Sequence, residues 1–197
     1  MDSDKENNIF LEHARLPSKL SGSFFDSRNV EIPIMGITGF NEEYQKGKKR
    51  STWFNGEIIS PNYISNSGCA CKSHIEGIVT DSGTLHFLEQ VNDFMAREGD
   101  CYEFLLNVKD KLKTPLIFEG SVIARINRNG FKPNKIGEAI IEINPFWSAR
   151  PNEGGVSRNF SLKNQSQHPV NGSYIPAFWD EFIKQIDKQG YAHPYQL

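Results

Sequence analysis

Short apolar runs separated by clusters of Gly, Pro, Asn and Ser dominate the first half of the chain. Runs rich in β-branched and aromatic residues cover Val30–Ile37, Thr52–Ser60 and Ile75–Thr80. Their lengths and their turn-forming borders are typical of strands. Pro33 lies in the first run and favours an edge or irregular strand there, because proline donates no backbone hydrogen bond. We therefore expect strands and loops from Val30 onwards.

The N-terminal segment carries no sustained hydrophobic period. A short helix fits between Ile9 and Leu20, interrupted by Pro17. We expect residues 1–29 to form a peripheral arm. Residues 30–197 are expected to form one domain, since 197 residues with 38% hydrophobic content suffice for one core.

Apolar residues recur at helical spacing in the middle of the chain. The first such stripe consists of Phe87, Leu88, Val91, Phe94 and Met95. Gly99 follows where a C-terminal cap belongs, so the pattern predicts a helix over Thr84–Arg97. A second helix is predicted from Asp100, because Glu103 stands three residues on as in a capping box, and Pro115 ends it. Its apolar stripe consists of Cys101, Phe104, Leu105, Val108 and Leu112.

A β-hairpin over residues 73–90 is the alternative to the first helix. His74, Glu76 and His86 would then share one face of two paired strands. Two histidines and a carboxylate are a ligand set for iron, manganese or zinc with open positions for substrate. The helical stripe favours the helix and argues against this metal site.

A second hairpin and a terminal helix complete the predicted elements. Residues 116–127 and 135–144 alternate between apolar and polar positions on either side of Asn129-Gly130, a strong hairpin signal. An amphipathic helix follows from Pro176 to Gly190. Strands, then helices, then strands, without βαβ alternation, predict an α+β fold. It would consist of a mostly antiparallel sheet with two consecutive central helices, a β-hairpin and a C-terminal helix packed on the sheet.

Charge and cysteine content narrow the functional classes. A net charge of -2 gives no field that would attract a nucleic-acid backbone or an anionic membrane, and Glu42 and Glu43 dilute the basic cluster at residues 46–50. The N-terminus lacks the apolar run of a secretory signal, and no stretch reaches membrane-spanning length. Three cysteines leave at least one thiol unpaired within a monomer, which suits a reducing compartment. We expect a cytoplasmic protein without membrane or nucleic-acid partners.

Cys101 is the leading candidate for a catalytic nucleophile. At the start of the predicted second helix, the helix dipole and unpaired amides would favour its thiolate. The hexapeptide Gly99-Asp100-Cys101-Tyr102-Glu103-Phe104 resembles the nucleophile helix of papain-like and transglutaminase-like cysteine enzymes. This resemblance implies a downstream histidine that exchanges the proton and an Asn or Asp that orients it. His168 and Asn171 are assigned to these roles, so we predict a cysteine-dependent hydrolase or acyl-transfer enzyme.

A noncatalytic binding or regulatory module is the competing hypothesis, in which Cys101 is only a buried core residue. The loop of residues 150–173 is long and polar, and such loops are usually functional or disordered. Aromatic residues lie near predicted loops and strand ends, where they anchor protein partners or line small-ligand pockets. They are Phe24, Phe25, Trp53, Phe54, Phe146 and Trp147.

Two further clusters carry weaker signals for metal binding. Cys69-Ala70-Cys71, with His74 nearby, spaces its thiols more tightly than structural zinc motifs do. Three glutamates of the second predicted hairpin fit the solvated face of an antiparallel sheet. They are Glu119, Glu138 and Glu142. We therefore expect no bound metal or cofactor.

Overall fold

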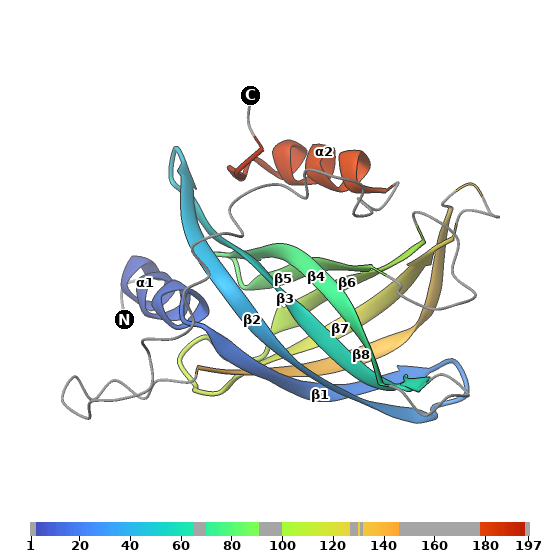
Figure 1. Cartoon of the computed structure of the whole chain (residues 1–197). Coiled ribbons are helices and arrows are strands. Elements are labelled where there is room, and N and C mark those ends of the chain that lie inside the picture. Colours follow the sequence, from blue (N-terminus) through green and yellow to red (C-terminus); the bar gives the residue numbers. More distant parts are fainter. Residues whose placement is uncertain are drawn as a thin grey trace.

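The computed structural model describes residues 3–64, 70–90, 100–126, 130, 132–145 and 178–195. Eight antiparallel strands follow one another in chain order around a closed barrel, and the last strand pairs with the first. One helix precedes the barrel and one follows it (Figure 1). The strands are β1 (Ser18–Asp26), β2 (Glu31–Lys46), β3 (Lys49–Ile64), β4 (Ala70–Thr80), β5 (Thr84–Gln90), β6 (Cys101–Val108), β7 (Leu116–Arg125) and β8 (Pro133–Pro145).

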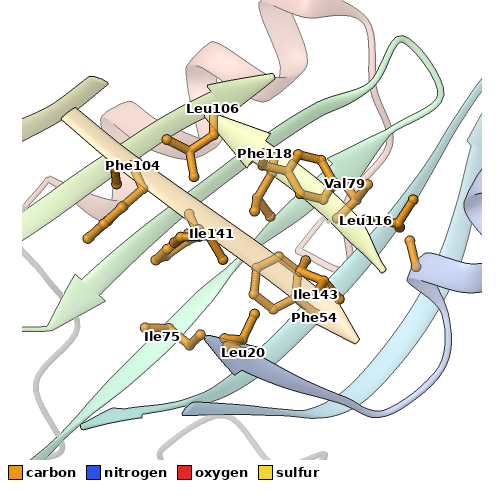
Figure 2. Close-up of a cluster of buried hydrophobic side chains, with 14 of the residues drawn as sticks. Leu20, Phe54, Ile75, Val79, Phe104, Leu106, Leu116, Phe118, Ile141 and Ile143 are labelled. Atoms are coloured by element: carbon orange, nitrogen blue, oxygen red, sulfur yellow. The ribbon is translucent and has the colours of Figure 1, made fainter. Parts of the chain in front are cut away.

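Side chains alternate between the inside and the outside of the barrel. Phe54, for example, belongs to the cluster inside the barrel, whereas the neighbouring Trp53 belongs to a separate cluster outside it. Figure 2 shows the inward aromatic and aliphatic side chains meeting in the interior. Phe87 and Phe104, from paired strands, stack with their ring centroids 4.4 Å apart. An eight-stranded barrel is just wide enough for such side chains, so this part of the interior is a packed core.

Glycine is required where β1 and β8 close the barrel. A Cβ atom at Gly22 would lie 2.0 Å from the carbonyl oxygen of Ile140, and one at Gly137 would lie 2.0 Å from that of Phe25. Both contacts are to the backbone of the paired strand, which cannot move aside. Glycine therefore allows the tight coiling that a small barrel needs.

Helix α1 (Ser3–Ala14) closes one end of the barrel. Phe10 and Leu11 are fully buried and belong to the interior cluster. The Phe10 ring centroid lies 6.2 Å from that of Phe118 on β7. The segment expected as a peripheral arm, residues 1–29, thus supplies both this plug and strand β1.

Helix α2 (Trp179–Gln189) lies against the outside of the barrel (Figure 1). Phe182 and Ile186 are fully buried in the outer cluster, together with residues from β3 to β6. Gly190 adopts a φ of 83° and caps the helix, so the predicted C-terminal helix is confirmed. Within the described residues, neither helix is long and apolar enough to span a membrane.

Several strands predicted from hydrophobic alternation are confirmed. The runs at residues 30–37, 52–60 and 75–80 correspond to parts of β2, β3 and β4. The hairpin predicted around Asn129-Gly130 is formed by β7 and β8. Their alternating burial reflects a barrel wall with its core on one side.

The expected α+β fold is wrong, because the two predicted central helices are strands. The segment predicted as a helix over Thr84–Arg97 begins with β5, which runs to Gln90, and the next predicted helix is β6. Strand β5 and the first residues of β6 are buried on two faces, inward against the core and outward beneath α2, whereas Leu105 further along β6 is exposed. Outward positions such as Leu88 are therefore apolar too, and this loss of alternation imitates helical spacing. The hairpin of residues 73–90, considered as the alternative, is the structure that forms.

Candidate functional site

The barrel end opposite α1 is lined by one inward side chain from each strand. We call these eight residues the mouth ring, because they stand at or near the last described inward positions of their strands. Strand register relates them as neighbours: Phe24 pairs with Ile32, Ile58 with Ser73, and Glu89 with Tyr102. The mouth ring consists of Phe24, Ile32, Ile58, Ser73, Glu89, Tyr102, Ala124 and Ile136.

Three neighbouring strands give the mouth ring a polar wall. Ser73, Glu89 and Tyr102 lie on β4, β5 and β6 in that order. Glu89 is directly opposite Tyr102 on one side and Ile75 on the other, and Ser73 is two residues from Ile75. Directly opposed Cβ atoms in antiparallel sheets are about 5 Å apart, and diagonal neighbours about 7–8 Å. The Glu89 carboxyl group therefore has a hydroxyl-bearing residue on each side.

The Ser73 hydroxyl is the hydrogen-bonding group of this wall that the described residues leave available. Ser73 is 0% exposed, Glu89 is 3% exposed, and Ser73 Oγ has no hydrogen-bond partner among the described residues. A buried hydroxyl without a hydrogen-bond partner lowers the free energy of unfolding by about 1–3 kcal/mol. Proteins usually satisfy such groups with other protein atoms, with water or with a ligand. A second hydroxyl of this kind, Thr52 Oγ1, lies in the α1 half of the interior.

The opposite wall of the mouth ring is apolar. Phe24 and Ile136 are partly buried and pack against the interior cluster, and Ile32 is also partly exposed. The aromatic pair below them is almost inaccessible, with Phe87 1% and Phe104 3% exposed. The mouth ring therefore forms the boundary between the packed core and the surface, with one polar and one apolar wall.

A second polar cluster lies outside the barrel, beneath α2. His86 Nε2 donates to Glu103 Oε1 at 2.8 Å, and Arg125 donates through Nε and a terminal nitrogen to Glu103 Oε2 at 2.9 and 2.7 Å. Aromatic side chains cover both Arg125 and His86. The Phe178 ring lies 3.9 Å from the Arg125 guanidinium carbon, and the Phe182 ring centroid is 4.6 Å from that of His86. We call His86, Glu103 and Arg125 the outer charge network.

Hydrogen bonds hold the carboxyl group of this network in its ionised form. Burial alone would raise the pKa of Glu103, but the hydrogen bonds and charges of His86 and Arg125 outweigh it and lower the pKa. The ionised carboxylate accepts the hydrogen bond from His86 Nε2. His86 Nδ1 is buried without a hydrogen-bond partner among the described residues. The network is therefore well suited to fix β5, β6 and β7 beneath α2.

Cys101 occupies the first position of β6, not the start of a helix. It faces outward, is 0% exposed, and packs in the outer cluster with residues such as Leu88 and Phe178. Burial, with the nearby negative charge of Glu103, raises the pKa of the thiol to about 12. Both effects favour a protonated, unreactive thiol and are the reverse of those expected at a helix N-terminus.

The other predicted members of the cysteine site, His168 and Asn171, lie outside the described residues. The same holds for the whole loop of residues 150–173 and for Cys69. Within the described residues, no hydrogen bond joins Cys101 to a histidine. The catalytic assignment therefore stays a prediction.

The metal hypotheses gain no support from the described part of the chain. Although the hairpin of β4 and β5 forms, His86 is committed to Glu103, whereas His74 is exposed and lies 4.0 Å from Glu76. No group of three or more ligating side chains with metal-binding geometry occurs among the described residues. Glu119 and Glu138 are exposed on the outer face, where they pair with neighbouring lysines.

The basic cluster of residues 46–50 contributes to the packing of α2. Lys46 lies 3.8 Å from Asp187, and Lys49 donates to the carbonyl oxygen of Gln189. The Lys49 ammonium group also lies 4.9 Å from the Tyr191 ring. These contacts give the cluster a structural role at the C-terminus of α2.

Comparison of the chain with models of protein families, with curated proteins and with solved structures finds no significant match.

Proposed function

We propose that this protein is a noncatalytic binding protein whose mouth ring holds a small, mostly apolar ligand. The observation that carries this proposal is the Ser73 hydroxyl, fully buried beside Glu89 and without a hydrogen-bond partner among the described residues. An alanine at this position would avoid the cost of the buried hydroxyl. A ligand that hydrogen-bonds to Ser73 removes that cost in the bound state and so gains affinity from it.

The shape of the barrel supports a ligand of limited size. Helix α1 closes one end through Phe10 and Leu11, and the stacked Phe87 and Phe104 rings fill the centre. A ligand that enters the barrel at the mouth ring would therefore be stopped by this floor. Mouths of β-barrels that combine an apolar wall with a few convergent polar groups are common ligand sites.

This proposal keeps the binding class predicted from the sequence but places its site in the barrel. The prediction of a cysteine-dependent hydrolase remains the second hypothesis, since His168 and Asn171 are outside the described residues. The buried Cys101 and its raised pKa weigh against it. A cytoplasmic location, without membrane or nucleic-acid partners, remains our expectation from the sequence.

The proposal is tested with Nile red, a neutral apolar dye whose fluorescence rises in apolar sites. We expect saturable binding of one dye molecule per chain. Ile32→Trp should weaken it at least tenfold, because the larger side chain fills the partly exposed wall. The matched control is Glu119→Gln on the exposed outer face, which should leave the affinity within twofold.

Folding of each variant is checked by circular dichroism, and Phe24→Trp serves as a second blocking variant on another strand. Ser73→Ala should fold at least as stably as the parent, because it removes a buried unsatisfied hydroxyl. Absence of saturable binding, or equal affinity in the folded blocking variants and the control, would refute the proposed site.

A further inference from the structure

We infer that this protein forms a symmetric dimer through an apolar strip on the outer face of β2 and β3, which packs against the same strip of a second copy. This inference goes beyond the proposed function, because the strip lies on the outside of the barrel and the mouth ring faces inward. We call Pro33, Met35, Ile37 and Ile59 the outer strip. Three observations support the dimer: the exposure of the strip, the sizes of the side chains beside it, and the charges that flank it.

The exposure of the outer strip is the first argument. Met35 is 54% exposed and Ile37 is 40% exposed, whereas Ile34 belongs to the interior cluster, so alternate residues of β2 face outward. Pro33 is exposed as well, and Ile59, directly opposite Met35 on β3, is partly exposed. Helix α2 packs on the other part of the outer wall, with residues of β3 to β6 (Figure 1). Single exposed apolar residues are ordinary, but contiguous ones favour an interaction surface.

The sizes of the neighbouring side chains give the second argument. Strands β1 and β3 lie on either side of β2, each about 4.8 Å away. A twofold axis parallel to β2 therefore places Met35 and Ile37 against the same residues of the second copy, and β1 of one copy opposite β3 of the other. Ser21, which is directly opposite Met35 on β1, then meets Ile59 of the second copy. The small serine leaves room for the larger isoleucine, and this contact occurs twice.

The charges beside the outer strip give the third argument and fix its orientation. Lys19 on β1 and Glu57 on β3 are both directly opposite Ile37, and both are exposed. The same twofold axis places Lys19 of each copy opposite Glu57 of the other, so the opposite charges match on both sides of the strip. A carboxylate accepts several hydrogen bonds, so Glu57 can receive this lysine in addition to its contacts within its own chain. A twofold axis across the strands at Met35 would instead place Lys19 opposite the uncharged Ser23.

Sedimentation velocity of the full chain, at protein concentrations from about 1 to about 300 µM, tests the dimer. The strip is short and the barrel wall is convex, so we expect a weak dimer whose fraction rises with concentration. Met35→Glu places two carboxylates against each other at the axis and should raise the dissociation constant at least tenfold. Circular dichroism checks that each variant is folded.

Reversal of the flanking charges tests the orientation. Lys19→Glu brings two carboxylates together on each side of the strip, and Glu57→Lys brings two ammonium groups together. Each should raise the dissociation constant at least fivefold. The double variant restores opposite charges across the interface, so its dissociation constant should be within twofold of the parent value. The matched control is Glu119→Lys, which reverses an exposed charge on β7 and should change the constant less than twofold.

Three results would overturn the inference. A chain that stays monomeric at about 300 µM would assign the outer strip to a different partner or to none. A dimer that is as stable in the folded Met35→Glu variant as in the parent would use another surface. A double variant weaker than both single reversals would exclude the twofold axis parallel to β2. Because all these substitutions are on the outer face, Nile red binding at the mouth ring tests the proposed function separately.

Discussion

Glu103→Gln is predicted to destabilise the protein by about 3 kcal/mol. The Glu103 carboxylate accepts one hydrogen bond from His86 and two from Arg125, all between 2.7 and 2.9 Å. Removing one partner of a buried ion pair typically costs about 3–5 kcal/mol, because the remaining charge stays buried. The lower end applies here, since the Arg125 side chain is 11% exposed and keeps its contact with the Phe178 ring.

Urea denaturation followed by tryptophan fluorescence measures this loss. The ring centroids of Trp53 and Trp179 lie 6.0 Å apart where α2 meets the barrel, so the emission of these two residues reports on this interface. With a urea slope of about 2 kcal/mol/M, the midpoint should fall by about 1.5 M. The control Glu119→Gln breaks only an exposed ion pair and should change the stability by less than about 0.5 kcal/mol.

A loss below about 1 kcal/mol in Glu103→Gln would refute the assignment of the network as a stabilising element. The double variant Glu103→Leu with Arg125→Met separates the cost of a broken pair from the contribution of the intact one. Replacing both charges by apolar groups is often neutral, so it should recover most of the stability lost in Glu103→Gln. A double variant as unstable as the single one would show that side-chain packing, not the unpaired charge, sets the loss.

Three further predictions concern the core, the outer network and the thiol. Because the pKa of Glu103 is lowered by folding, its contribution is complete above its unfolded value of about 4.3 and is lost as the pH falls toward the folded value. The stability difference between the parent and Glu103→Gln should therefore shrink between pH 6 and pH 3 in urea titrations. Cys101 should react with iodoacetamide at pH 8 only upon unfolding, because burial raises the thiol pKa to about 12; rapid native labelling located by mass spectrometry would contradict this. Phe10→Ala should cost about 3–5 kcal/mol in the urea assay through a cavity beneath α1, with a smaller loss in Phe10→Leu; an equal loss in both would exclude cavity size as the cause.

The sequence was sufficient to predict strands with one solvated face and the helix with a solvated side. In β8, the inward Ala139 and Ile141 alternate with exposed or half-exposed residues, so the period of two was visible. Helix α2 was equally clear, because Phe182 and Ile186 repeat at helical spacing and Gly190 ends the pattern. In both cases the burial of one face alone determined the pattern of side chains.

Strand β5 and the start of β6 could not be recognised in this way, because their outer faces are covered by a helix more than 70 residues further along the chain. Leu88 and Cys101 are buried outside the barrel for the same reason that Phe87 is buried inside it. In such a segment, the spacing of the apolar residues fits a helix as well as a strand that is buried on both faces. The apolar face of α2 needs an apolar surface to pack against. This requirement is the signal that would have favoured strands over helices for β5 and β6.

The candidate site was missed because its residues look unremarkable in the sequence. Ser73 and Glu89 are far apart along the chain and belong to no motif. Their relation follows only from the register of β4 and β5, in which Glu89 pairs with Ile75. Ile75 and Phe87 face the interior, and alternate residues of a strand share one face, so Ser73 and Glu89 face the interior as well. Most residues at such buried positions are apolar.

The hairpin of β5 and β6 carries one nearly buried glutamate on each strand, and the two face opposite sides of the barrel wall. Glu103 faces outward and meets His86 and Arg125, which match its charge and its hydrogen-bonding capacity, so structure alone explains why it is there. Glu89 faces inward beside Ser73, whose buried hydroxyl lacks a partner among the described residues. Sites that break a rule of stable packing without compensation inside the fold are the expected locations of function. The hydrogen bonds of Glu103 thus support a stabilising role for the outer network, and the Ser73 hydroxyl supports our proposal of a ligand at the mouth ring.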